Sequence, residues 1–180
     1  GVCERVVGPL LRPDRDRWVL ASKLGNRMSA RPNESRYSRK WMMQEVEASL
    51  SRLQTDYLDI CYMHRDFEED DLEEALRSMD DLIRAGKIRY FGLSNFRAWR
   101  LAEVVHLCRQ IGMPGPVICQ PYYNLLNRLP EVEVLPACRY HGIGVAPYSP
   151  IARGVLTGKY APGTLPEAGS RAARGDRRIM

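Results

Sequence analysis

A lysine and a histidine close two short apolar runs of this sequence, and these two side chains could take part in proton transfer. Lys23 ends the run WVLASK, and His64 ends the run YLDICYMH. The carboxyl ends of parallel strands meet at one mouth when the sheet closes into a barrel. A cation and an imidazole at that mouth would supply part of a proton-transfer site.

Polar side chains also close the three apolar runs that follow: Ser94 with Asn95, then Gln120, then Tyr148 with Ser149. Each of them alone has a structural explanation, such as helix capping, turn formation or a solvated strand end. As a set they suit a planar ligand that carries an amide. Asn95 and Gln120 can both donate and accept hydrogen bonds, as a carboxamide requires, and Tyr148 offers a ring face for stacking.

Other common catalytic and metal-binding patterns are missing. The sequence has no GxSxG nucleophile elbow and no GxxxxGK[ST] phosphate loop, which disfavours the commonest hydrolases and phosphoryl transferases. His106 and His141 lack partners at metal-ligand spacing, so we expect both to be structural and the site to contain no metal.

The elements that would position these side chains alternate regularly along the chain, which indicates parallel βα units. Apolar runs predict strands over Trp18–Ser22, Leu58–Tyr62, Ile88–Leu93, Val117–Cys119 and Ile143–Tyr148. Amphipathic stretches predict helices over Arg39–Leu53, Leu72–Ala85, Ala98–Ile111 and Val132–Tyr140. The Gly- and Arg-rich remainder predicts a long loop.

Five βα units fit either an open doubly wound sheet or part of a closed barrel. No GxGxxG fingerprint follows the first predicted strand, which weakens the open-sheet alternative. An eight-stranded barrel typically takes ~250 residues, whereas this chain has 180 and starts at Gly1 rather than Met. The prediction is an incomplete (β/α)8 TIM barrel of about five units. We expect one partial domain, residues 1–180, an internal fragment without the N-terminal strand or strands and the C-terminal units.

Composition restricts the class of protein further. With 44% hydrophobic and 27% charged residues and no apolar run long enough to span a bilayer, we expect a cytoplasmic protein with no membrane association and no secretion signal. The five cysteines are widely spaced, without CxxC, and predict buried free thiols. The arginine-rich end lacks interleaved aromatic residues, which disfavours nucleic acid and favours a loop that meets a phosphate group.

Five longer strings extend these motifs: WVLASKLGN, SLSRLQTDYLDICYMH, AGKIRYFGLSNF, QPYYNLLNR and APYSPIARGVLTGKY. Together they resemble the aldo-keto reductases, NADPH-dependent (β/α)8 barrel enzymes, over nearly the whole chain. The last three strings look like the branch that includes bacterial glyceraldehyde-type reductases and potassium-channel β subunits.

The resemblance implies roles for the two residues first noted. Lys23 matches the family's lysine that lowers the pKa of a catalytic tyrosine, because a nearby cation favours the phenolate. His64 matches the histidine that orients and polarises the substrate carbonyl. The family's catalytic aspartate and acid tyrosine lie in a DTAxxYG segment that would precede Gly1, so neither is in this sequence.

The resemblance also implies a site for NADPH/NADP. Ser94, Asn95 and Gln120 match the residues that hold the nicotinamide carboxamide, and Tyr148 matches the aromatic side chain that stacks on the ring. The implied phosphate-binding residues are Ser149, Pro150, Ile151, Ala152 and Arg153 around the pyrophosphate, with Lys159 and Arg171 as a cationic clasp. The family's main site for the adenosine 2′-phosphate lies beyond this sequence, so the preference for NADPH over NADH is implied by resemblance alone.

The implied activity is the reduction of a small aldehyde or ketone. Substrate loops of this fold lie largely outside the sequence, so the carbonyl compound is not named, and an oligomer is possible. Two alternatives remain open. One is a regulatory subunit of the channel β-subunit type that uses the same site as a redox sensor, and the other is a fragment without activity of its own.

Overall fold

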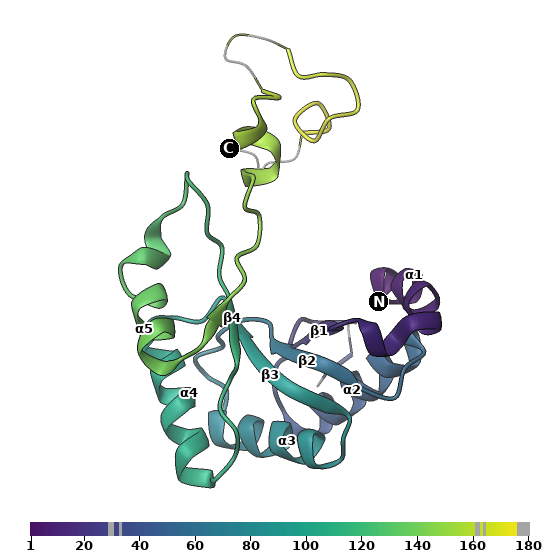
Figure 1. Cartoon of the computed structure of the whole chain (residues 1–180), viewed down its shortest axis with the longest axis vertical. Coiled ribbons are helices and arrows are strands. Elements are labelled where there is room, and N and C mark those ends of the chain that lie inside the picture. The colour runs from purple at the N-terminus through teal and green to yellow at the C-terminus, as the bar shows by residue number, and fades with distance from the viewer. Residues whose placement is uncertain (29–30, 33, 161–162, 164, 176–180) are drawn as a thin grey trace.

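Five parallel strands form one sheet in which neighbours in space are also neighbours in sequence, in the order β1-β2-β3-β4-β5 (Figure 1). They are β1 (Ala21–Leu24), β2 (Leu58–Met63), β3 (Ile88–Ser94), β4 (Ile118–Gln120) and β5 (Gly144–Val145). The computed structural model describes residues 1–28, 31–32, 34–160, 163 and 165–175. A doubly wound sheet reverses its strand order at a switch point, whereas a barrel adds each strand beside the last. The observed order is therefore that of a (β/α)8 barrel.

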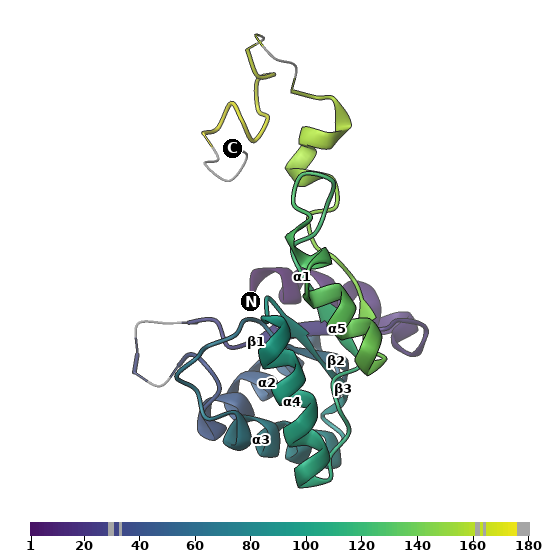
Figure 2. The same cartoon turned by 90° about the vertical axis from the view of Figure 1, so that its left-hand side faces the viewer.

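The helices that connect these strands are α2 (Arg39–Leu53), α3 (Leu72–Arg84), α4 (Ala98–Ile111) and α5 (Val134–His141), with α1 (Val2–Leu11) before the first strand. Consecutive helices contact one another from α1 through α5. They lie side by side around the outer face of the curved sheet, as Figures 1 and 2 show. This is the outer helical layer of a barrel.

The core lies between this helical layer and the sheet. On α2 the predicted apolar stripe is buried: Met42, Val46, Leu50 and Leu53. These residues share one hydrophobic cluster with fully buried side chains of the central strands, among them Leu58, Met63, Phe91 and Leu93. The burial of these apolar side chains stabilises the domain mainly through the hydrophobic effect. It also fixes the strand ends relative to one another.

Local signals set the helix ends. Both α2 and α4 have the bounds predicted from the sequence, and α4 ends at Gly112, whose φ of 73° is left-handed. Asp71 is the N-cap of α3, and its carboxylate accepts hydrogen bonds from the amides of Glu73 and Glu74 at 2.9 and 3.2 Å. Such capping satisfies amide groups that have no partner inside the helix.

Several predicted elements differ from the structure in their bounds or their type. The first strand is Ala21–Leu24 rather than Trp18–Ser22, because the residues that pair with β2 run from Ala21 to Leu24. The last strand is only Gly144–Val145, since its pairing with β4 stops there. The last predicted helix begins at Val134 after a separate 3-10 turn, and the predicted long loop contains the 3-10 helix η3 (Ala152–Thr157).

The N-terminal helix was not predicted from the sequence. It packs on α2 at Gly8, where a Cβ atom would lie 2.4 Å from the carbonyl oxygen of Leu53. Glu4 of α1 and Glu45 of α2 both pair with Arg52, at 2.5 and 2.8 Å. A 3-10 helix, η1 (Arg12–Arg17), then leads to β1.

The cysteine prediction is confirmed except at one position. All five thiols are free; Cys61, Cys108, Cys119 and Cys138 are buried, whereas Cys3 is exposed on α1. No helix in the described ranges has the length and apolar character needed to cross a membrane.

Candidate active site

Lys23 and His64 line the same cavity, of about 360 Å³, at the carboxyl ends of β1 and β2. Lys23 belongs to β1 and pairs with Tyr62, while His64 directly follows β2. Parallel pairing in this register brings the two side chains to one end of the sheet. Gly1 and Asn26 line the same cavity.

The Lys23 ammonium is half-buried, and burial lowers its pKa below the usual value. It lies 5.4 Å from the centre of the Tyr62 ring. Among the described residues, no carboxylate pairs with it. An unpaired cation in a cavity can stabilise an anion there, such as the phenolate of a tyrosine or an oxyanion.

His64 is held as a neutral imidazole. Burial lowers its pKa, and the positive charges of Lys23 and Arg65 lower it further. Its Nδ1 lies 2.8 Å from Nδ2 of Asn26. Because Nδ1 is engaged by that amide, Nε2 is the ring nitrogen available to a ligand.

The predicted amide residues form one connected network beside His64. Asn95 Nδ2 donates to the backbone carbonyl of His64 at 3.0 Å and to Ser94 Oγ at 3.1 Å. The Ser94 hydroxyl donates to the backbone carbonyl of Gln120 at 2.9 Å. The Tyr148 hydroxyl donates to Asn95 Oδ1 at 2.8 Å. These bonds fix the orientation of the Asn95 amide and tie three strand ends together.

Tyr148 is stacked on a second aromatic ring. Its ring centroid lies 5.3 Å from that of Tyr122, with 26° between the planes. The guanidinium of Arg153 lies 5.9 Å from the Tyr122 ring centre. The aromatic pair therefore links the amide network to the residues after β5.

Several residues here adopt left-handed backbone conformations that non-glycine residues rarely take. Asn95, Ser149, Ala152 and Arg153 have φ values of 56°, 56°, 47° and 56°. Such residues concentrate at functional sites, where the surrounding structure holds them. Turns of this kind also present backbone N–H groups to anions.

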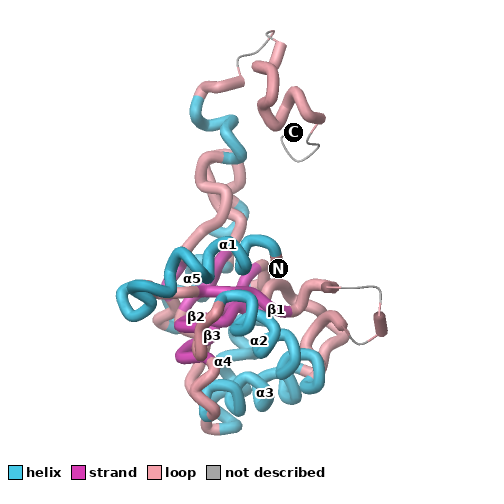
Figure 3. Tube along the Cα trace, turned by 90° about the vertical axis from the view of Figure 1, so that its right-hand side faces the viewer, coloured by secondary structure: helices cyan, strands magenta, loops and turns pink. Residues whose placement is uncertain are grey.

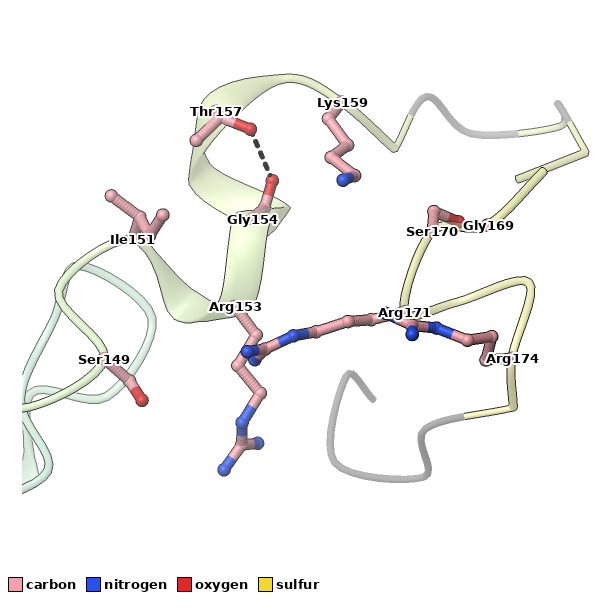
Figure 4. A pocket seen from close by; sticks show the side chains of 10 residues that line it. All are labelled: Ser149, Ile151, Arg153, Gly154, Thr157, Lys159, Gly169, Ser170, Arg171 and Arg174. Atoms are coloured by element: carbon pink, nitrogen blue, oxygen red, sulfur yellow. Dashed lines mark hydrogen bonds between the residues drawn. The ribbon is translucent and has the colours of Figure 1, made fainter. Parts of the chain in front are cut away.

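A second cavity, of about 620 Å³, is cationic, and Figure 4 shows the side chain of Arg171 reaching across it toward Arg153. The basic residues that line it are Arg153, Lys159, Arg171 and Arg174. None of the described residues in its lining is acidic. The segment that carries it extends away from the sheet, as Figure 3 shows. Like charges that converge on one space favour a polyanionic ligand.

The structure does not bring every predicted phosphate residue to this cavity. Ser149, Ile151 and Arg153 line it, whereas Pro150 lines a different cavity beside Tyr123 and Ala152 is buried. Ser149 and Ala152 have left-handed backbone conformations in this stretch, with φ of 56° and 47°. Among the lining residues that the sequence prediction missed are Thr157 and Arg174. The arginine-rich end signalled the second of them only as part of a general excess of charge.

Asn26 was likewise not singled out from the sequence, although it stands three residues after Lys23 in the string WVLASKLGN. Its spacing carries no signal for a contact with a residue 38 positions away. In the part of the chain that is described, no cluster of three or more His, Cys, Asp or Glu side chains could hold a metal ion.

Sequential parallel strands with polar side chains at their carboxyl ends define the class of (β/α)8 barrel proteins. The sequence profile of the Aldo/keto reductase family matches residues 1–175, and the chain belongs to this family.

The named relatives include both kinds of protein in the predicted branch, a potassium channel β subunit and a glyceraldehyde-type reductase. The chain is 40% identical over 136 residues to a probable voltage-gated potassium channel subunit beta of Arabidopsis thaliana, which covers 75% of the chain and 42% of that protein. It is 36% identical over 168 residues to L-glyceraldehyde 3-phosphate reductase of Escherichia coli (strain K12), with 91% and 48% covered. It is 40% identical over 116 residues to aflatoxin B1 aldehyde reductase member 2 of Mus musculus, with 64% and 32% covered. The chain thus spans about half the length, or less, of the curated relatives it matches.

Proposed function

We propose that this chain is part of an NADPH-dependent reductase that converts an aldehyde or ketone to an alcohol. The observation that carries the proposal is the shared cavity of Lys23 and His64, in which an ammonium that pairs with no carboxylate of the described residues lies with an imidazole of lowered pKa. This pair suits a carbonyl oxygen that gains negative charge as it is reduced.

Each residue of the pair has a distinct role in the proposed reaction. The Nε2–H group of His64 donates a hydrogen bond to the carbonyl oxygen and orients it. The Lys23 ammonium lowers the pKa of the group that gives the oxygen its proton. We propose that the proton donor is the family's acid tyrosine, which is not among the residues of this sequence.

The cofactor proposal rests on the amide network and the cationic cavity. Ser94, Asn95 and Gln120 meet at adjacent strand ends, where their polar groups suit a carboxamide. The four basic side chains of the second cavity suit a pyrophosphate. When bound, the cofactor supplies a hydride from its nicotinamide C4. The protein holds it and excludes water from the reacting carbon.

Lys23→Met tests the proposed role of the lysine in the complete barrel protein. We expect kcat to fall by about 100-fold, within the range of a positioned proton-transfer group, while the Kd for NADPH stays within about twofold. His64→Ala should reduce kcat/KM for the carbonyl substrate and leave NADPH binding intact. Steady-state kinetics and fluorescence titration with NADPH measure these quantities. Loss of NADPH affinity with turnover unchanged in Lys23→Met would contradict the proposed role.

Arg171→Ala and Lys159→Ala test the cationic cavity. Removing one charge-assisted contact to a phosphate should raise the Kd for NADPH by about 10-fold, equivalent to ~1.4 kcal/mol. Lys40→Ala, an exposed lysine on α2, is the matched control and should leave the Kd unchanged. Equal Kd values for all three variants would place the phosphates elsewhere.

A regulatory subunit remains the second candidate, since one relative is named a probable potassium channel subunit beta. Both candidates would bind NADPH, so binding does not separate them. Turnover does separate them. Tight NADPH binding with negligible reduction across a broad panel of aldehydes would favour the redox-sensing subunit.

A further inference from the structure

The loop after β1 brings the side chain of Asn26 against the imidazole of His64, with 2.8 Å between Nδ2 and Nδ1. Both side chains line the cavity that contains Lys23. An amide nitrogen only donates hydrogen bonds, so Nδ1 of the imidazole accepts. A neutral imidazole whose Nδ1 accepts carries its single proton on Nε2.

This loop is fixed to the backbone beside His64. The Tyr37 hydroxyl donates to the carbonyl oxygen of Arg65 at 2.6 Å and accepts from its amide at 3.1 Å. Gly25, directly before Asn26, has a φ of 109°, and a Cβ atom there would lie 2.5 Å from the buried Tyr37 ring. Asn26 is therefore held by the same packing that holds the chain after β2.

Charged or titratable side chains from four segments line the cavity or face the imidazole: Lys23 on β1, Arg65 after β2, Cys3 and Glu4 on α1, and Glu45 on α2. Both carboxylates pair with Arg52, at 2.5 and 2.8 Å. Burial and the two cations keep the pKa of His64 below its usual value. The imidazole is thus neutral near pH 7. What remains to be specified is its tautomer, that is, which ring nitrogen carries the proton.

We propose that Asn26 is a positioning residue that holds His64 in the tautomer with the proton on Nε2. Its purpose rests on the proposed carbonyl reduction, because Nε2–H can donate to a carbonyl oxygen, whereas the opposite tautomer would turn a lone pair toward that oxygen. The tautomer itself is a property of the protein with or without substrate.

Nitrogen-15 NMR of histidine-labelled protein measures the tautomer directly. In the wild type we expect a protonated Nε2 and an unprotonated Nδ1 for His64 near pH 7. Asn26→Asp keeps the size of the side chain but only accepts, so it should move the proton to Nδ1 and raise the pKa of His64. Asn26→Leu removes the bond and should give a mixture of tautomers. His106 and His141 are internal controls and should not change in either variant.

Two results would overturn the assignment: a wild-type His64 with its proton on Nδ1, or a tautomer unchanged in both variants. Should Asn26→Leu fail to fold, Asn26→Asp alone decides between these results. A loss of stability without any change in tautomer would likewise show that Asn26 is only structural.

Kinetics of the same variants test the purpose of the bond. In Asn26→Leu, kcat for a carbonyl substrate should fall by about 10-fold, part of the ~10²–10⁴ that a positioned proton-transfer group contributes, with the Kd for NADPH unchanged. An altered tautomer with unchanged kcat and KM would overturn the positioning role. A wild type with the expected tautomer but without carbonyl reduction would instead contradict the proposed function and leave the tautomer assignment standing.

Discussion

At the scale of single residues, the electrostatics of His64 follow from its neighbours. Burial is the largest cause of its lowered pKa, and the charges of Lys23 and Arg65 add to it. The folded pKa lies below the unfolded value of about 6.5, so the unfolded state binds more protons as the pH falls. The contribution of His64 to stability is therefore complete above about pH 6.5 and is lost as the pH falls through the folded pKa.

We expect Lys23→Met to raise the pKa of His64, because it removes one of the two positive charges that lower this pKa. Proton NMR titration of the imidazole measures this pKa. Lys40→Met changes an exposed lysine on α2 that does not line the cavity and serves as the control. An unchanged His64 pKa in Lys23→Met would mean that the two groups do not interact.

At the scale of elements, the contact between α1 and α2 depends on the absence of a side chain at Gly8. A Cβ atom there would lie 2.4 Å from the carbonyl oxygen of Leu53 and 2.8 Å from its Cα. Backbone atoms cannot rotate away as a flexible side chain can, so the two helices would have to separate. Glu4 and Arg52, paired at 2.5 Å, would be displaced with them.

Gly8→Ala should therefore lower the free energy of unfolding by about 1–3 kcal/mol, the range of overpacked cores, although alanine has the higher helix propensity. Gly115→Ala is the matched control, because a Cβ atom there meets nothing within 4 Å; we expect a change below about 0.5 kcal/mol. Urea denaturation of both variants gives the comparison. Equal changes in the free energy of unfolding for the two variants would show that α1 can move away from α2 with little loss of stability.

At the scale of the whole molecule, the sheet is open within the described residues, with β1 at one edge and β5 at the other. Unpaired edges and exposed apolar side chains favour association with other chains. Val145 on β5 is 39% exposed, and Val19 before β1 is 76% exposed. The 180 residues by themselves should thus be poorly soluble or only partly folded, and inactive.

Val145→Lys should reduce this self-association, because a charge on an edge strand opposes pairing with another edge. Leu165→Lys, at an exposed position outside the sheet, is the control and should have little effect. Sedimentation velocity over a range of concentrations measures the association. A monomeric chain with a cooperative thermal transition would contradict the expectation.

The sequence by itself determined the helices that lie between the strands, the order of those elements and the family. The bounds of α2 and α4 follow from apolar spacing and from residues that stop a helix locally, such as Gly112. The polar strand ends were also visible, because each directly follows an apolar run. These features depend on neighbours within a few positions along the chain, and a single sequence contains that information.

Only the tertiary structure decided which residues meet across the sheet. The bounds of β1 and β5 depend on their ladders to β2 and β4, and the contact of Asn26 with His64 joins residues 38 positions apart. Pro150 and Ala152 are likewise separated from the cationic cavity, whose lining does not include them. Each is set by packing between distant segments, for which local spacing carries no signal. The sequence spacing predicted that Lys23 and His64 lie at the same end of the sheet. Only the fold showed that Asn26 contacts His64 Nδ1, the contact proposed to hold the proton on Nε2.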